Sequence, residues 1–524
     1  MTSKRNRQHE ANSLSRHPAR RALAAFASTC LVFSALLVGG AQPGSASSSY
    51  DPASDSYSMA NVTSQIGASA WWDAGYTGTG VDVAVIDTGV TPVPALSGSG
   101  KLVYGPDLSL ESQSPSLRDL DSYGHGTFMA GLIAGHDSSL SAPYSQAPAT
   151  AYRGVAPDAR IISLKVGTTD GGADVTQVIA AIDWVVQHAH DPGFDIREIS
   201  LSYGTNSSQS YTSDPLAFAA EQAWKHGIVV IAAAGNTGYQ RGHGAPGLAD
   251  PAYDPYVIGV GGYDTHGSST VHDDQMGSYS ASSTGDGGAK NPDFVSVGSH
   301  LQGLRVPGSY IDANNPSGAL DSLYMRGSGT SEGTAMTAGA VALILQKYPD
   351  LTPDQVKQFI QRNAQKVPGA DDQAQGSGEL DLNAMLADAP AGYAKASPPP
   401  PARPAPPAPP APPAPKLPKA PKGAKVAPLA PLAPLAPLAP ATLDVVLQPA
   451  TPPVITQQGP TPPAAHYPDS NGQGSLEASR GSDHLTQNGK LLTGNVDIFG
   501  HPFDANAVAQ AEAQGNSWSG GSWN

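Results

Sequence analysis

Four polar residues of this sequence stand where an apolar run or a glycine-rich turn meets a new segment, which places their side chains for chemistry. Asp87 lies near the end of VDVAVIDTG, His125 between two glycines in DSYGHGTFMAGLIAG, Asn236 at the end of IVVIAAAGN, and Ser331 within GSGTSEGTAM. A hydrolytic serine needs a base, a group that orients this base, and donors for the oxyanion. These four residue types offer one candidate for each role.

Each of these residues also has a simpler structural interpretation, and both interpretations stay open for the residues taken singly. Asp87 fits a cap of the turn that follows it, and Ser331 fits a helix N-cap, which is the more common role for a serine at such a junction. His125 fits an ordinary residue at a helix start, and Asn236 fits an Asx-turn.

The elements that must position these residues follow from the pattern between residues 58 and 390. Short runs rich in β-branched residues alternate with helical patterns, which is typical of a largely parallel, buried sheet. Thr352, Pro353 and Gln355 form the start signal of one helix, with a capping box. The alternation predicts an α/β layered domain. The predicted strands are 81–89, 160–166, 198–204, 228–236 and 256–262, and the predicted helices include 174–189, 216–227 and 352–367.

The motifs DTG, GHGT, AAAGN and GTS occur in this order at the expected strand ends and helix starts, and together they resemble those of the subtilisin-like serine peptidases, the subtilases of peptidase family S8. The resemblance covers about residues 58–390. It implies a three-layer domain with a largely parallel sheet flanked by helices. It also implies a secreted serine endopeptidase that hydrolyses peptide bonds through an acyl-enzyme intermediate.

The resemblance assigns a role to each candidate residue. Asp87 orients the base, His125 acts as general base and then as general acid, and Ser331 is the nucleophile. Asn236 and the backbone N–H of Ser331 form the oxyanion hole.

The same resemblance places the substrate. Residues 202–204 pair with extended substrate and, together with residues 233–235, wall the pocket for the residue before the cut, while Gly171 and Gly172 edge the other side. Polypeptides are the implied substrates, and the chemistry requires no cofactor or metal. Calcium is common in the family, but the scattered Asp and Asn residues do not allow its ligands to be assigned. The substrate-binding group is Ser202, Tyr203, Gly204, Ala233, Ala234 and Gly235.

Three positions depart from the family pattern. Ala335 stands where the family carries a proline, and this exchange is expected to cost modest stability. Phe128 replaces a second histidine that has no catalytic role. Glu332 directly follows the predicted nucleophile, where better-known members carry an apolar residue. A carboxylate beside a forming oxyanion opposes it, so either lowered activity or a shifted pH optimum is expected.

The N-terminal 46 residues have the pattern of a secretory signal peptide, with six basic residues before an apolar run from Ala22 to Gly40 and small residues after it. Cleavage is predicted after Ala46, with Ala41 as the second choice and an uncleaved membrane anchor as the alternative. Few residues separate Ala46 from the family-like region, so no long inhibitory prodomain is expected. No membrane-spanning segment is expected after cleavage.

Charge and composition describe the remainder of the chain. The 524 residues carry a formal charge of −15, which removal of the signal peptide would bring to −20, and an acidic exported protein is a poor candidate for nucleic-acid binding. Residues 397–442 are predicted to be a disordered proline-rich linker, with 19 prolines between Pro398 and Pro440. Residues 443–524 are predicted to be a low-complexity, mostly unpacked tail, with Trp518 and Trp523 as contact points.

Two rival functions remain from other classes. The first is a catalytically weak or silent subtilase-fold module that binds peptides or the cell surface, which Glu332 and the linker favour and the complete set of catalytic residue types opposes. The second is a structural adhesin in which the linker and tail contact the cell envelope.

Overall fold

The computed structural model describes residues 50–238, 247–284, 289–392, 467–487 and 489–516. The predicted signal peptide (1–46), the linker (397–442), Trp518 and Trp523 lie outside the described residues. In the part of the chain that is described, no helix combines the length and the apolar character needed to cross a membrane.

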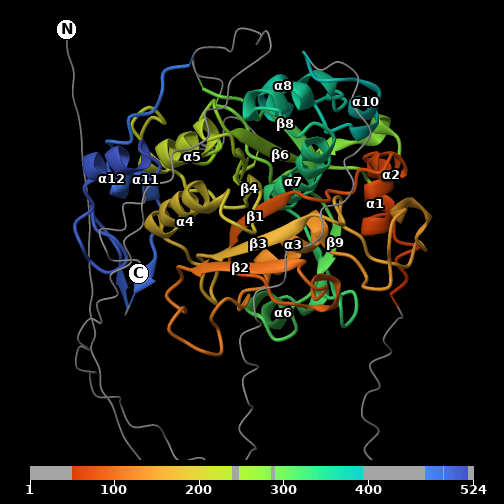
Figure 1. The fold of residues 1–524 in the computed structure, drawn as a ribbon, viewed down its shortest axis with the longest axis horizontal. Coiled ribbons are helices and arrows are strands. Elements are labelled where there is room, and N and C mark those ends of the chain that lie inside the picture. The colour runs from red at the N-terminus through yellow and green to blue at the C-terminus, as the bar shows by residue number, and fades with distance from the viewer. Residues whose placement is uncertain (1–49, 239–246, 285–288, 393–466, 488, 517–524) are drawn as a thin grey trace, which may run out of the picture. The chain divides into compact units, whose positions relative to one another are not determined.

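Eight strands form the main sheet, in the order β2-β3-β1-β4-β5-β6-β7, with β8 also paired to β6. All of these pairs are parallel except β6 with β7. The sheet therefore has the largely parallel order expected from the alternating pattern (Figure 1). Its strands are β1 (Asp82–Asp87), β2 (Leu102–Asp107), β3 (Arg160–Lys165), β4 (Ile196–Leu201), β5 (Val229–Ala233), β6 (Ile258–Asp264), β7 (Gln275–Met276) and β8 (Phe294–Val297).

Helices flank this sheet, which confirms the predicted fold class. Both faces are covered, because every residue of β1 and of β5 is buried. The helices of the main domain are α1 (Met59–Gln65), α2 (Ala68–Asp73), α3 (His125–Ala134), α4 (Val175–His188), α5 (Pro215–Lys225), α6 (Tyr310–Asn314), α7 (Thr330–Lys347), α8 (Pro353–Asn363), α9 (Asp372–Gln375) and α10 (Leu382–Ala387). Two further strands, β9 (Leu301–Leu304) and β10 (Tyr324–Gly327), form an antiparallel pair.

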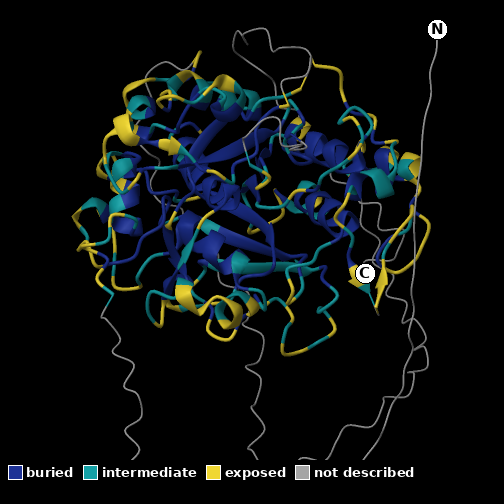
Figure 2. Ribbon diagram, turned by 180° about the vertical axis from the view of Figure 1, so that it is seen from behind, coloured by how far each residue is buried: buried dark blue, intermediate teal, exposed yellow. Residues whose placement is uncertain are grey.

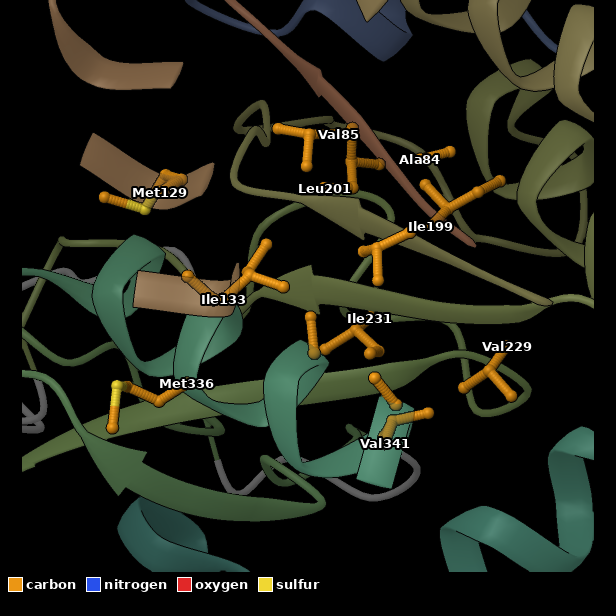
Figure 3. Packing of buried hydrophobic residues seen from close by; sticks show 14 of the residues in the cluster. Ala84, Val85, Met129, Ile133, Ile199, Leu201, Val229, Ile231, Met336 and Val341 are labelled. Carbon is orange, nitrogen blue, oxygen red and sulfur yellow. The ribbon is translucent and has the colours of Figure 1, made fainter. Parts of the chain in front are cut away.

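Helix α3 packs against α7, and helix α4 packs against α5. All four helices also contact strands of the sheet. Helix α7 is buried along nearly its whole length, in keeping with a sequence that is apolar or small all round. Figure 3 shows Ile133 of α3 and Val341 of α7 among side chains of the central strands, including Ile199 and Ile231. Figure 2 shows the buried residues concentrated in the sheet and on the helix faces toward it.

The predicted element boundaries are close to those observed, and the differences are local. Asp174 caps α4 instead of belonging to it, with Gln177 completing a capping box. Thr352 caps α8 with Gln355, as predicted from the sequence. Strand β2 was not predicted, because its sequence LVYGPD contains both glycine and proline and none of its residues is fully buried.

The expectation of a mostly unpacked tail is wrong for its described residues. These residues form α11 (Leu476–Arg480), α12 (Ala505–Glu512) and the short antiparallel strands β11 (Thr486–Gln487) and β12 (Lys490–Leu491). Helices α11 and α12 contact α5, and α11 also contacts α4 (Figure 1). Leu476 and Val508 are almost completely buried there. The few apolar residues of the tail suffice because they complete an existing core.

Candidate active site

The four candidate residues all lie at junctions of these elements. Asp87 is the last residue of β1, and Asn236 follows the end of β5. His125 is the first residue of α3, and Ser331 is the second residue of α7. Strands β1 and β5 run parallel within one sheet, and the carboxyl edge of such a sheet is where α/β folds expose functional groups.

Asp87 and His125 contact each other directly. The Nδ1 of His125 lies 2.8 Å from Oδ1 and 3.0 Å from Oδ2 of Asp87. The carboxylate side chain is only 4% exposed, whereas the imidazole is 23% exposed, so the pair presents its histidine side to solvent. Because a carboxylate accepts, this contact places the ring proton on Nδ1 and leaves Nε2 as the acceptor.

Two opposing effects set the pKa of His125. Burial disfavours the charged imidazolium, but the Asp87 charge and its hydrogen bond outweigh burial, and Glu332 and Asp121 add to them. The net result raises the pKa of His125 to about 9. The neutral imidazole that can accept a proton is therefore favoured at alkaline pH in the free protein.

The contact of Asp87 with His125 requires glycine at one neighbouring position. A Cβ on Gly126 would collide with the carbonyl oxygen of Gly89 and would stand 3.1 Å from the Cβ of Asp87. The motif GHGT thus allows α3 to begin directly against the end of β1. The glycine also leaves its backbone N–H free to donate to the Thr88 hydroxyl at 3.0 Å.

Asp121 is a supporting residue that the sequence reasoning missed. Its carboxylate accepts from Gly124 N–H at 2.6 Å, from Thr127 N–H at 2.8 Å and from the Thr88 hydroxyl at 2.8 Å. It therefore fixes the first turn of α3, which carries His125, to the loop after Asp87. The sequence does not mark Asp121 for this role, because aspartate is common in loops and the N-cap of α3 is Gly124.

Ser331 and His125 belong to adjacent helix starts. Phe128 in the first turn of α3 and Glu332 in the first turn of α7 both lie against Gly327, because a Cβ there would meet the side chains of both. Ser331 is 9% exposed, and its carbonyl oxygen accepts from the Ser202 hydroxyl at 3.2 Å. The helix start also adds a field that favours negative charge near the serine.

Thr330 positions Asn236 and was also missed from the sequence. The Oδ1 of Asn236 accepts from the N–H of Thr330 at 2.9 Å and from its hydroxyl at 3.1 Å. The Thr330 hydroxyl in turn accepts from Gly235 N–H at 3.2 Å. Because Thr330 occupies the side-chain oxygen of Asn236, the exposed amide keeps only its Nδ2 hydrogens to donate to another group.

Glu332 lies inside the same site. Its side chain is 6% exposed, and its carboxylate lies against the backbone of Gly327 and Gly329. Burial raises the pKa of Glu332 to about 7, although the nearby His125 acts in the opposite direction. Glu332 therefore ionises near neutral pH, and its charge interacts with the imidazole.

The predicted substrate-binding residues lie on the strand ends beside this site. Ser202, Tyr203 and Gly204 follow β4 and are not fully buried, whereas Ala233 and Ala234 at the end of β5 are buried. Gly204 and Gly235 both approach Ala249, since added Cβ atoms would lie 2.7 and 3.3 Å from its Cβ. The structure thus brings the two parts of the predicted pocket wall, 202–204 and 233–235, together, and their role in binding stays a prediction.

A model of the subtilase family matches residues 78–378, which is more than half of the chain. The chain belongs to the subtilase family. The match covers the ends of β1 and β5 and the starts of α3 and α7, and it leaves the described C-terminal residues outside.

Two curated relatives show how far this likeness extends. The subtilase is 36% identical over 307 residues to serine protease AprX of Bacillus subtilis (strain 168), covering 58% of this chain and 65% of that protein. It is 31% identical over 290 residues to subtilisin DY of Bacillus licheniformis, covering 55% of this chain and 85% of that protein.

The described residues do not form a recognisable metal site. Within the described ranges, no group of three or more His, Cys, Asp or Glu side chains could hold a metal ion. The calcium that the resemblance suggests therefore stays a prediction without assigned ligands.

Proposed function

We propose that this subtilase is a serine endopeptidase that hydrolyses polypeptides through an acyl-enzyme intermediate. The observation that carries the proposal is the direct contact of His125 Nδ1 with the buried Asp87 carboxylate at the helix start adjacent to that of Ser331. This contact leaves Nε2 as the ring acceptor, which is the arrangement a general base requires.

The proposed mechanism assigns a role to each of the four residues. His125 accepts the proton of Ser331 as the hydroxyl attacks the peptide carbonyl carbon, and it later donates this proton to the leaving amine. Asp87 holds the imidazole in the required tautomer and stabilises its charged form. The Nδ2 of Asn236, together with the N–H of Ser331, donates to the oxygen that becomes negative. Water then cleaves the acyl-enzyme by the same sequence of proton transfers.

The test compares hydrolysis of an unfolded protein by the wild type and by Ser331→Ala, from about pH 5 to pH 10. Ser328→Ala is the matched control, because Ser328 lies three residues away, is exposed and accepts from His300 N–H. We expect the wild type and Ser328→Ala to hydrolyse the substrate and to be labelled by a fluorophosphonate. We expect Ser331→Ala to do neither. Folded wild type and Ser331→Ala with equal, background hydrolysis would instead favour the silent peptide-binding module.

We also infer that the protein is exported, on the support of the signal-like pattern of residues 1–46. N-terminal sequencing of the protein recovered outside the producing cell is expected to begin at Ser47, or at Gln42 for the second cleavage choice. An intact N-terminus in a membrane fraction would contradict this inference. Contact with the cell envelope through the linker and tail is tested by the same fractionation with residues 397–524 removed.

A further inference from the structure

The described C-terminal residues, 467–487 and 489–516, form a segment that docks on α4, α5 and the loop between β4 and α5. We call it the C-terminal segment. Its first part is held by backbone groups: Asn471 N–H donates to Thr212 O at 2.9 Å, and Ser470 N–H donates to the Glu221 carboxylate at 2.8 Å. These are ordered, specific contacts.

Arg480 is the central anchor of this segment. Its Nε donates to Oδ2 of Asp174 at 2.6 Å, and both side chains have no exposed surface. The other guanidinium donors reach the carbonyl oxygens of Gly494 and Val496, each at 2.6 Å. A buried arginine satisfied on all sides in this way fixes geometry, because any displacement would leave charges unpaired.

The residues around Arg480 connect the two predicted edges of the substrate groove. On one edge, Asp174 follows Gly171 and Gly172 in the chain. On the other edge, directly after Ser202–Gly204, the Thr205 hydroxyl donates to Ser479 O, and Asn206 N–H donates to the Asp483 carboxylate at 3.1 Å. The stretch 479–485 therefore bridges these two predicted edges.

Leu485 reaches the groove edge itself. Its Cδ1 would lie 2.9 Å from a Cβ placed on Gly172, and the side chain is 7% exposed. The ring of Tyr123, which lies 6.5 Å from the ring of His125, contacts the neighbouring Gly171 in the same way. The edge formed by Gly171 and Gly172 thus lies between a tyrosine near the catalytic histidine and a leucine of the C-terminal segment.

We infer that residues 479–485 form the far wall of the substrate groove and that Leu485 is a specificity-determining residue for a distal substrate side chain. The inference rests on the proposed function. Ser202 contacts Ser331, and Thr205 is three residues farther on, about 10 Å in an extended chain. The wall therefore acts on substrate residues several positions from the scissile bond. Leu485 is almost buried and packs behind Gly172, so the edge that it supports is apolar and suits an apolar side chain.

The experiment measures kcat/KM of the full chain, as isolated, for two sets of fluorogenic peptides. One set carries a single residue before the cut, and the other carries five residues with Ala, Leu or Phe at the distal positions. Leu485→Ala enlarges the site, so the preference for distal Phe over Ala is expected to rise about tenfold or more, the effect of a few methylene groups. Leu485→Phe should lower the same preference. Short peptides should react equally with all variants.

Leu491→Ala is the matched control, because Leu491 lies in the same segment but is 61% exposed. An unchanged distal preference in both Leu485 variants would overturn the inference, as would an equal change for short peptides. If the protein hydrolyses nothing, the proposed function fails separately. The same peptides, labelled with a fluorophore, are then tested for binding by anisotropy. Binding that changes with Leu485 would support the wall, and binding indifferent to Leu485 would overturn it.

Discussion

Thr330 donates two hydrogen bonds to the side-chain oxygen of Asn236, one from its N–H at 2.9 Å and one from its hydroxyl at 3.1 Å. The residue before the proposed nucleophile thereby orients the amide proposed for the oxyanion hole. One short stretch of chain, from Thr330 to Ser331, then fixes both the attacking group and its electrostatic support.

Asn236→Ala is expected to lower kcat by about 10²–10³-fold with little change in KM, because the lost donor acts on charge that develops in the transition state. Thr330→Val keeps the N–H donor and loses only the hydroxyl, so a smaller loss is expected. Steady-state kinetics on a peptide substrate measures both. An unchanged kcat in the folded Thr330→Val variant would contradict the positioning role of the Thr330 hydroxyl.

Asp87→Asn is expected to lower kcat by about 10⁴-fold near neutral pH, since an amide cannot hold His125 in the required tautomer. Thermal unfolding controls for folding, because Asp87 also accepts from Thr88 N–H at 2.7 Å. Activity of a folded Asp87→Asn variant within tenfold of the wild type would remove Asp87 from the mechanism.

Glu332→Gln is expected to move the acidic limb of the pH profile of kcat/KM to lower pH. Glu332 is one of the charges that raise the pKa of His125 to about 9, and its own pKa is raised to about 7. Without its negative charge the imidazolium is less favoured, so the neutral base forms at lower pH. Activity at pH 7 should rise roughly two- to fivefold, which corresponds to a shift of less than one unit. Asp372→Asn, at a 75% exposed side chain, is the control and should leave the profile in place.

Arg480→Met is expected to destabilise the docked C-terminal segment by about 3–5 kcal/mol, because it leaves the Asp174 carboxylate buried without its partner. Hydrogen exchange of residues 467–487 and 489–516 reports the detachment. Adding Asp174→Asn should recover much of the loss, since asparagine still caps α4. Arg362→Met breaks a half-exposed pair with Asp388 and should cost less than about 1 kcal/mol.

The sheet and the helices of the main domain could be predicted because their signals are local. Runs such as VDVAVIDTG carry their own period and stop residues, and Thr352, Pro353 and Gln355 mark a helix start within four residues. The positions of Asp87 and His125 followed from motifs at such boundaries. Their contact, once formed, depends on the missing Cβ of Gly126, which the motif also contains.

The supporting contacts could not be predicted in this way. Aspartate and threonine are common in loops, so the sequence does not distinguish Asp121 and Thr330. Only the folded structure shows which groups they hydrogen-bond. The prediction of an unpacked C-terminal segment was wrong for a related reason, because the segment has few apolar residues of its own. Its stability comes from a core and a carboxylate that lie some 300 residues earlier in the chain.

The distance in sequence between Asp174 and Arg480 delays the formation of their ion pair during synthesis. The carboxylate that starts α4 is synthesised 306 residues before the arginine that pairs with it. At about 5–20 residues per second, Arg480 leaves the ribosome roughly 15 to 60 seconds after Asp174. During synthesis, the main domain therefore has an interval in which this surface is unoccupied. A product that ends before Arg480 would therefore keep the Asp174 carboxylate without its arginine partner.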